Sequence, residues 1–203
     1  MHPAAAQYQE LLQRLDRWFD ESARRHPGVI PCRAGCSACC HGPFDISVAD
    51  ALLLREGLAT LPDDIRAVVR ARGAQLLQQM QAAAPEWGAL WDVRALDEER
   101  FDQLTEALAA EPCPLLDETG ACRVYAYRPL VCRLIGLPMM TEEGELLENA
   151  CPIQDDFPAY ASLDPQLFDL GAMHTMEAEM LEAAAGDGDP GFETVIAAVV
   201  SAP

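Results

Sequence analysis

Eight cysteines restrict the fold of this chain more than any other feature, because they gather in two segments instead of being spread along it. Four lie within nine positions and four are spaced further downstream: Cys32, Cys36, Cys39 and Cys40, then Cys113, Cys122, Cys132 and Cys151. Cysteines that serve only as small apolar core residues are scattered over buried faces instead. Dense clustering is typical of thiolates gathered around a metal. We therefore expect all eight to be metal ligands.

Disulfides and redox-active thiols are the two alternatives for these cysteines. The count is even, but 203 residues, half of them apolar, can form a core without covalent staples, and no secretory signal is visible. Adjacent Cys39 and Cys40 could pair only as a strained vicinal disulfide. The Cys-x-x-Cys spacing at 36–39 lacks the preceding strand of a redox motif. Both alternatives are weaker than metal binding.

The charge balance excludes several function classes. Asp and Glu number 33 against 14 basic residues, a net charge of −19, and every basic residue is an arginine. A mechanism that needs a lysine nucleophile or a P-loop lysine is excluded. Nucleic acids and anionic membranes are bound largely through basic residues, so we expect neither as a partner. We expect metal ions as partners, and the sequence leaves a protein partner open. The chain shows no apolar leader and no membrane-length apolar run, which indicates a cytoplasmic location.

Four arginines lie next to or between the cysteines: Arg33, Arg123, Arg128 and Arg133. A site of four thiolates around zinc or an oxidised four-iron cluster carries a formal charge of about −2. We expect these arginines to stand behind the ligands and offset that charge. The alternative is that they are ordinary surface residues.

The rest of the pattern predicts a mostly α-helical fold, in which two irregular cysteine-rich segments form the metal site or sites. We expect one domain over residues 1–185, with residues 186–203 as a linker and a short C-terminal helix or tail. Apolar periodicity and helix-start signals predict the helices. They cover residues 1–25, a stretch after the capping residue Ser47, a stretch from 61 onward, residues 97–110, and a stretch opened by Asp164-Pro165. Residues 111–158 are expected to be irregular, with a short hairpin around Val124 and Tyr125.

The cysteine spacing and its neighbours resemble a known family. The motif residues are Cys32-x3-Cys36-x2-Cys39-Cys40, Phe44 to Ser47, Cys113-Pro114-Leu115-Leu116, Gly120-x-Cys122, Tyr125, Arg128-Pro129, Cys132-Arg133 and Cys151-Pro152. Residues 32–152 are thus similar to the YkgJ-type cysteine-cluster proteins, a zinc- or iron-chelating family that typically carries eight cysteines. Larger relatives that methylate flagellin lysines are thought to hold an iron–sulfur cluster. This chain has no glycine-rich nucleotide loop, so the resemblance does not imply methyltransferase activity.

The metal stays open at this point. The loop 32–39 can supply three corners of a [4Fe-4S] cluster, and with the relatives this favours iron or an iron–sulfur cluster slightly over zinc. We then expect metal or cluster carriage, storage or sensing, without catalytic residues. The near-equal alternative is a closed structural zinc protein or interaction module. A radical-SAM-type modifying enzyme shares the loop spacing, but the chain has little of the strand pattern of its barrel.

Copper(I) is a less favoured choice of metal. Soft or imidazole ligands outside the cysteines are present in the sequence: His41, Met139, Met140, Met173, His174, Met176 and Met180. Methionines at helical spacing more often fill the core.

Overall fold

The computed structural model describes residues 3–33, 35–88, 91–141, 144–145, 151–167, 169–186, 188–189 and 191–202. Within these ranges the chain is mostly α-helical with little sheet, as the sequence predicts. The helices are α1 (Pro3–Arg25), α2 (Val48–Ala59), α3 (Asp63–Ala83), α4 (Glu98–Ala107), α5 (Val131–Leu134), α6 (Leu170–Ala185) and α7 (Ile196–Ser201). The strands are β1 (Asp45–Ser47), β2 (Met139–Met140), β3 (Gln166–Leu167) and β4 (Glu193–Val195). Short 3₁₀ turns are η1 (Val93–Ala95), η2 (Tyr125–Tyr127), η3 (Gln154–Asp156) and η4 (Tyr160–Ser162).

The helix starts follow the expected signals. The Oγ of Ser47 accepts the backbone N–H of Asp50 at 3.2 Å, which caps α2. The carboxylate of Asp97 accepts the N–H of Arg100 at 2.8 Å and caps α4. Asp63 and Asp64 lie in the first turn of α3, where the helix dipole favours negative charge.

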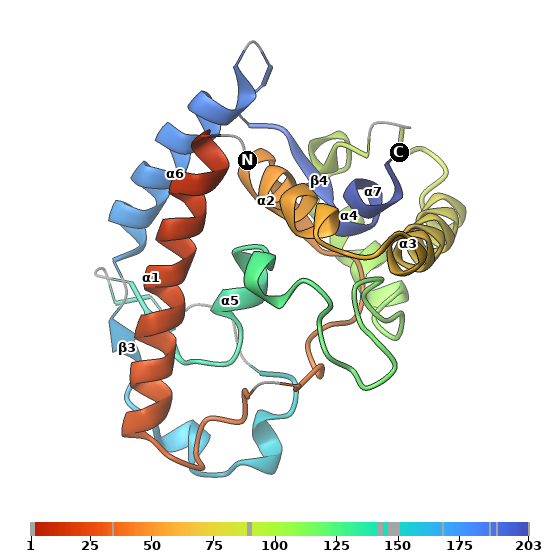
Figure 1. The fold of residues 1–203 in the computed structure, drawn as a ribbon. Helices are drawn as coiled ribbons and strands as arrows, with labels where there is room; N and C mark the ends of the chain where they lie inside the picture. Colours follow the sequence, from red (N-terminus) through yellow and green to blue (C-terminus); the bar gives the residue numbers. More distant parts are fainter. Residues whose placement is uncertain are drawn as a thin grey trace.

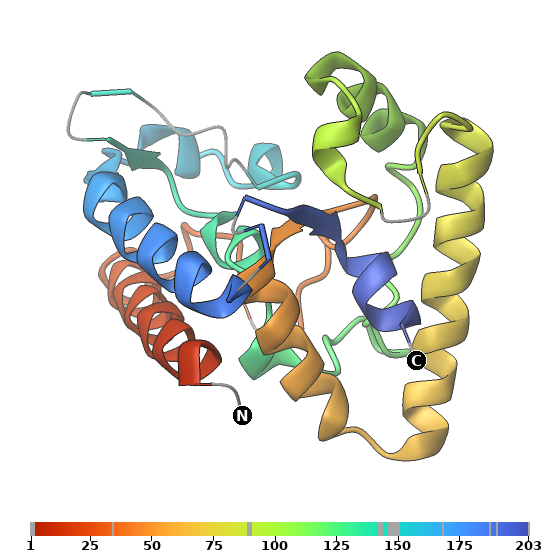
Figure 2. The same cartoon turned by 90° about the horizontal axis from the view of Figure 1, so that it is seen from above.

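Helix α2 lies between two groups of helices (Figures 1 and 2). Helices α1 and α6 pack side by side against one flank of α2, while α7 packs against the other flank and against α3. Strand β1 pairs antiparallel with β4, with Asp45 opposite Val195. This pairing attaches the C-terminal part of the chain directly behind the first cysteine segment.

Three clusters of buried side chains form the core. One contains the second cysteine segment together with residues of α2, α3 and α7: Ile46, Leu54, Leu58, Val69, Cys113, Leu115, Leu116, Val124, Ile196, Val199 and Val200. We call this the cysteine-side cluster. A second surrounds Trp87, and a third joins α1 to α2 through Tyr8, Leu11, Leu12, Ala49 and Leu53.

Three local predictions were wrong. Helix α6 begins at Leu170, not at Asp164-Pro165. Asp169 caps it by accepting the N–H of Ala172 at 2.7 Å. Residues 166–167 are not helical, because they pair parallel with β2. The hairpin closes between Leu116 and Cys122, upstream of Val124, because the Asp117 carboxylate accepts the N–H groups of its turn.

The third difference concerns Cys132, which lies in the short helix α5 and not in irregular chain.

Among the helices of the described ranges, none combines the length and apolarity needed to cross a membrane.

Candidate metal centre

The two cysteine segments lie antiparallel where they meet. The N–H of Cys113 donates to the carbonyl of Cys40 at 2.9 Å, and the N–H of Gly42 donates to the carbonyl of Glu111 at 2.7 Å. A bridge between His41 and Pro112 lies between these bonds. The backbone itself therefore holds Cys40 beside Cys113.

Two glycines let the segments approach closely. Gly136 has a φ of +103°, and a Cβ placed there would lie 2.9 Å from the Cβ of Cys32. Gly120 has a φ of +83°, and a Cβ there would lie 3.0 Å from the Oγ of Ser37. Glycine is required at such positions because its φ is unrestricted and no side chain fits. Cys32 thus lies directly against the chain that leaves α5.

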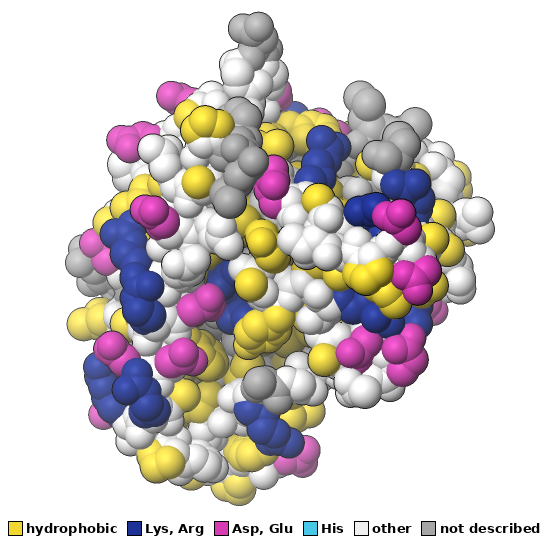
Figure 3. Space-filling model, viewed as in Figure 1, with side chains coloured by type: hydrophobic (Ala, Val, Ile, Leu, Met, Phe, Trp, Pro, Cys, Tyr) yellow, Lys and Arg dark blue, Asp and Glu magenta, His cyan; other side chains and the backbone are white. Residues whose placement is uncertain are grey.

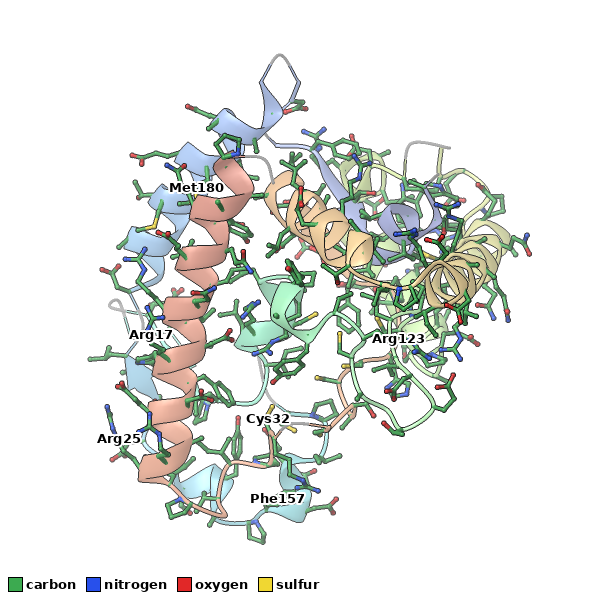
Figure 4. All side chains as sticks on the ribbon, in the orientation of Figure 1. Arg17, Arg25, Cys32, Arg123, Phe157 and Met180 are labelled. Atoms are coloured by element: carbon green, nitrogen blue, oxygen red, sulfur yellow. The ribbon has the colours of Figure 1, made fainter. Side chains whose placement is uncertain are left out.

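One group of thiols surrounds Cys32 and comes from the first segment and Cys151. Burial and the neighbouring thiols of Cys39, Cys36 and Cys151 raise the pKa of Cys32 to about 11. Burial also raises the pKa of Cys151, and Cys36 and Cys39 raise it further. Figure 4 shows sulfur atoms gathered beside Cys32, next to the segment that carries Phe157. We call Cys32, Cys36, Cys39 and Cys151 the loop group.

A second group of thiols belongs to the cysteine-side cluster. Cys113 is 9% exposed within it, and Cys40, Cys122 and Cys132 pack against it as partly buried side chains. Burial raises the pKa of Cys113 to about 12, with a smaller contribution from Cys122. Burial raises the pKa of Cys132 strongly, and Cys113 and Cys122 add to the shift. We call Cys40, Cys113, Cys122 and Cys132 the core group.

Cys39 and Cys40 connect the two groups. The neighbouring Cys40 thiol raises the pKa of Cys39 more than burial does. The charge of Cys39 also acts on Cys113 and Cys132 in the core group. Cys39 is therefore coupled to thiols of both groups, so the two groups lie side by side.

Two of the four expected arginines act on the thiols. Arg133 is almost fully buried: its side chain is 1% exposed, contacts the Asp16 carboxylate, and donates to the carbonyls of Arg128 and Ala126, each at 3.0 Å. Arg128 donates to Asp16 at 2.7 Å, and its guanidinium lies 3.9 Å from the ring centroid of Tyr125.

The charge of Arg128 opposes the rise in the pKa of Cys32, Cys39 and Cys122. Arg133 acts in the same direction on Cys122. These two guanidinium groups favour the thiolate form of the neighbouring cysteines.

The other two arginines are placed differently. Arg33 is exposed. The Nη2 of Arg123 donates to both oxygens of the Glu118 carboxylate, at 3.0 Å each. Figure 4 places Arg123 beyond the second set of sulfur atoms.

All eight cysteines are free thiols. Across the described ranges, no three Cys, His, Asp or Glu side chains stand in an arrangement that would hold a metal ion directly. The donor set nevertheless suits a thiophilic metal, because soft thiolates favour zinc, copper(I) and iron–sulfur clusters. One orphaned polar atom also fits a bound group: the buried hydroxyl of Tyr160 has no hydrogen-bond partner in the described parts of the chain.

The candidate copper ligands are dispersed. Met139 is 1% exposed, and Met176 and Met180 pack against the cluster that joins α1 to α2. The side chains of Met173 and His174 lie outside the described residues.

Sequence reasoning missed three residues beside the cysteines. Asp16 pairs with two arginines, the charge of buried Asp50 raises the pKa of Cys132, and the charges of Cys151 and Cys32 raise the pKa of Tyr160. Asp16 and Asp50 look like ordinary helix residues in the sequence. No motif marks Tyr160.

This architecture defines a class: a mostly helical protein in which two interlocked segments bring eight free thiols into adjacent groups. A family model described as "CxxCxxCC: Putative zinc- or iron-chelating domain" matches residues 31–152, and the chain belongs to this family. The matched range contains all eight cysteines, as the resemblance in the sequence predicts. Neither the curated proteins nor the solved structures contain a match to the chain.

Proposed function

We propose that this protein binds metal at two adjacent four-thiolate sites, one built from the loop group and one from the core group. The observation that carries the proposal is the packing of the thiols: Cys113 lies in the cysteine-side cluster with Cys40, Cys122 and Cys132 packed against it, while the charges of Cys36, Cys39 and Cys151 act on Cys32 outside that cluster. Each group supplies the four thiolates of a tetrahedral zinc site or an iron–sulfur cluster. The match to a zinc- or iron-chelating family supports the same donors.

The two sites differ in their surroundings, and this supports different roles. The core group lies among the largest set of buried side chains, so its metal would serve the fold. The loop group lies between the loop 31–41 and the turns that follow Cys151. Figure 3 shows a hollow lined by hydrophobic side chains on this face, between α1 and the loop segments. The loop site is the one suited to carriage, storage or sensing of metal.

Iron, as a [4Fe-4S] cluster or as chelated iron, is the preferred occupant of the loop site, with zinc the near alternative. Three cysteines from one tight loop are a common way to hold a cubane cluster. All-cysteine sites are normally closed and leave no open position for a substrate, so we propose no catalytic residue.

The direct test is anaerobic purification of the full chain, followed by elemental analysis, acid-labile sulfide assay and an absorption spectrum. Iron with sulfide and a visible absorption band would support a cluster. Two equivalents of zinc in a colourless protein would support two chelating sites and remove the cluster. A protein that binds neither metal, even after anaerobic reconstitution, would overturn the proposal.

The division into two sites is tested by comparing Cys151→Ser with Cys122→Ser. Each variant should lose about half of the bound metal, and the double variant should lose all of it. If the single variants each lost all the metal, one shared site would replace two.

A further inference from the structure

A groove runs along the seam where α1 and α6 lie side by side (Figure 2). Its volume is about 670 Å³, a size typical of small-molecule sites. Five polar residues on one face of α1 line it, together with Glu179 and Met180 of α6, and none of the lining residues is a cysteine. Figure 3 shows basic and acidic side chains next to each other over this flank of the molecule.

The two arginines of the groove have hydrogen-bond donors to spare. The Nη2 of Arg14 donates to the thioether sulfur of Met176 at 2.9 Å, and a thioether is a weak acceptor. Among the described residues, neither Arg14 nor Arg17 forms an ion pair, whereas Arg94 elsewhere on the surface pairs with two carboxylates. Each guanidinium group carries five N–H donors, so most of those in the groove are left for a ligand or for water.

The groove is acidic at one end and basic at the other. Helices α1 and α6 run in opposite directions (Figure 1), and Arg14 contacts Met176 across the groove. Glu179 therefore lies almost one turn beyond this contact toward the start of α1, on the side of Glu10. Figure 4 likewise places Met180 near the start of α1. Two carboxylates thus stand at one end of the groove, and two guanidinium groups stand at the other.

A ligand with charges of both signs fits this arrangement better than a simple anion or a simple cation. The net charge of −19 repels anions at long range, and a cation would leave the guanidinium groups without a partner. Guanidinium groups bind a carboxylate through charge-assisted hydrogen bonds, and carboxylates bind an ammonium group in the same way. A zwitterion satisfies both ends at once.

The length of the groove indicates the size of the ligand. Arg17 follows Glu10 by seven positions, a rise of about 10 Å along α1. An extended peptide rises about 3.3 Å per residue, so a tripeptide spans this distance. The side-chain amides of Gln7 and Gln13 also line the groove, and they both donate and accept, as peptide groups require. Met180 adds an adaptable apolar contact.

We propose that the groove between α1 and α6 binds a short zwitterionic peptide of tripeptide length, with its amino group at the two glutamates and its carboxylate at the two arginines. Both helices lie outside residues 31–152, the range that the family model matches. This site is therefore independent of the proposed metal sites.

The test is a titration of the isotope-labelled full chain with triglycine and with its two blocked forms, followed by NMR. N-acetyltriglycine keeps only the carboxylate, and triglycine amide keeps only the ammonium group. Triglycine should bind saturably and shift signals of α1 and α6. Each blocked form should bind about tenfold more weakly, because one end of the groove loses its charged partner.

Variants on α1 locate the site. Arg17→Gln and Glu10→Gln each remove one charge from an exposed side chain, and each should weaken triglycine binding about tenfold. Arg24→Gln is the matched control: Arg24 is exposed on the same helix, does not line the groove, and donates to the carbonyl of Asp20 at 3.2 Å. The control should bind triglycine as the wild type does.

Three results would overturn this site. The first is the absence of saturable triglycine binding at millimolar concentration. The second is equal binding of triglycine and either blocked form, since the groove would then not recognise both charges. The third is an equal loss of affinity in Arg24→Gln and Arg17→Gln, which would show a general charge effect. None of these readouts depends on metal content, so the failure of this site and the failure of metal binding are distinguishable.

Discussion

Gly136 and Gly28 form a useful pair at the scale of single residues, because only one of them packs against a cysteine. Both have positive φ, +103° and +75°, so alanine is strained at either position. A Cβ at Gly136 would lie 2.9 Å from the Cβ of Cys32, whereas a Cβ at Gly28 would meet nothing within 4 Å. A loss of metal affinity confined to the Gly136 variant therefore reports the contact with Cys32.

We expect Gly28→Ala to cost about 1–2 kcal/mol of stability, from backbone strain alone. Gly136→Ala should cost more and should also weaken metal binding at the loop group, because Cys32 must move away. Urea unfolding and cobalt titration of both variants measure this. Equal metal affinity in the two variants would show that Cys32 does not depend on Gly136.

Asp50 is a buried carboxyl group that faces groups from several elements. Its Oδ1 accepts the N–H of Leu130 at 2.9 Å. Burial raises the pKa of Asp50 to about 7, with Glu177 adding to the rise and Leu130, Tyr8 and Arg133 opposing it. The charge of Asp50 in turn raises the pKa of Cys132. Asp50 is only 3% exposed.

The raised pKa predicts how stability depends on pH. An unfolded aspartate loses its proton near pH 4, while folded Asp50 keeps it until about pH 7. Between these values the folded state binds more protons, so this group's stabilising contribution, complete below pH 4, falls by up to about 1.4 kcal/mol per pH unit as pH rises. Asp50→Asn retains an oxygen for the N–H of Leu130 and should flatten that slope. Urea unfolding of the metal-free protein at pH 5, 6 and 7 tests this, and identical slopes in variant and wild type would contradict it.

At the scale of elements, a carboxylate of α1 pairs with two arginines of the cysteine region. Asp16 contacts Arg128 and the buried Arg133, which follows Cys132 in α5. Helix α1 precedes the range matched by the family model, so Asp16 ties an added helix to the shared domain.

Asp16→Ala should therefore be strongly destabilising. Removing one partner of a buried pair typically costs 3–5 kcal/mol, and we expect about 3 kcal/mol because the Asp16 side chain is itself 31% exposed. Glu21→Ala is the control on the same helix, since Glu21 pairs with Arg25 at 3.8 Å with both side chains more than half exposed. The control should change stability by less than about 0.5 kcal/mol. Chemical denaturation compares them, and similar losses would remove the special role of Asp16.

Helix existence followed from the sequence better than helix boundaries did. The apolar spacing of α1, the cap at Ser47 and the start of a helix near residue 97 were readable because each is local in the chain. The start of α6 was not, because residues 166–167 pair with β2, a partner distant in sequence. The two cysteine segments could be recognised in the sequence by clustering, whereas the grouping of their thiols depends on long-range packing. Cys40 joins Cys113 through a backbone hydrogen bond between segments over seventy residues apart. Tyr160 was missed for the same reason.

At the scale of the whole molecule, the core group and the loop group connect to the fold in different ways. The core group packs with residues of β1, α2 and α7, such as Ile46, Leu54 and Ile196. The loop group is held through Gly136 and by the turns after Cys151. Metal binding contributes to folding stability where the thiolates are part of the core. Loss of metal from the core group should therefore destabilise distant helices, whereas loss of metal from the loop group should not.

Cys122→Ser and Cys151→Ser, each loaded with metal, separate these effects. Both should lose about half the metal, but only Cys122→Ser should lower amide-exchange protection in α2 and α7, because its thiol packs on the cysteine-side cluster that includes residues of both helices. Cys151→Ser should leave those helices protected and should loosen only the turns around Tyr160. Hydrogen exchange measured by mass spectrometry resolves the segments. If Cys151→Ser also exposed α7, the two sites would form one cooperative unit, and neither could release metal while the fold stays intact.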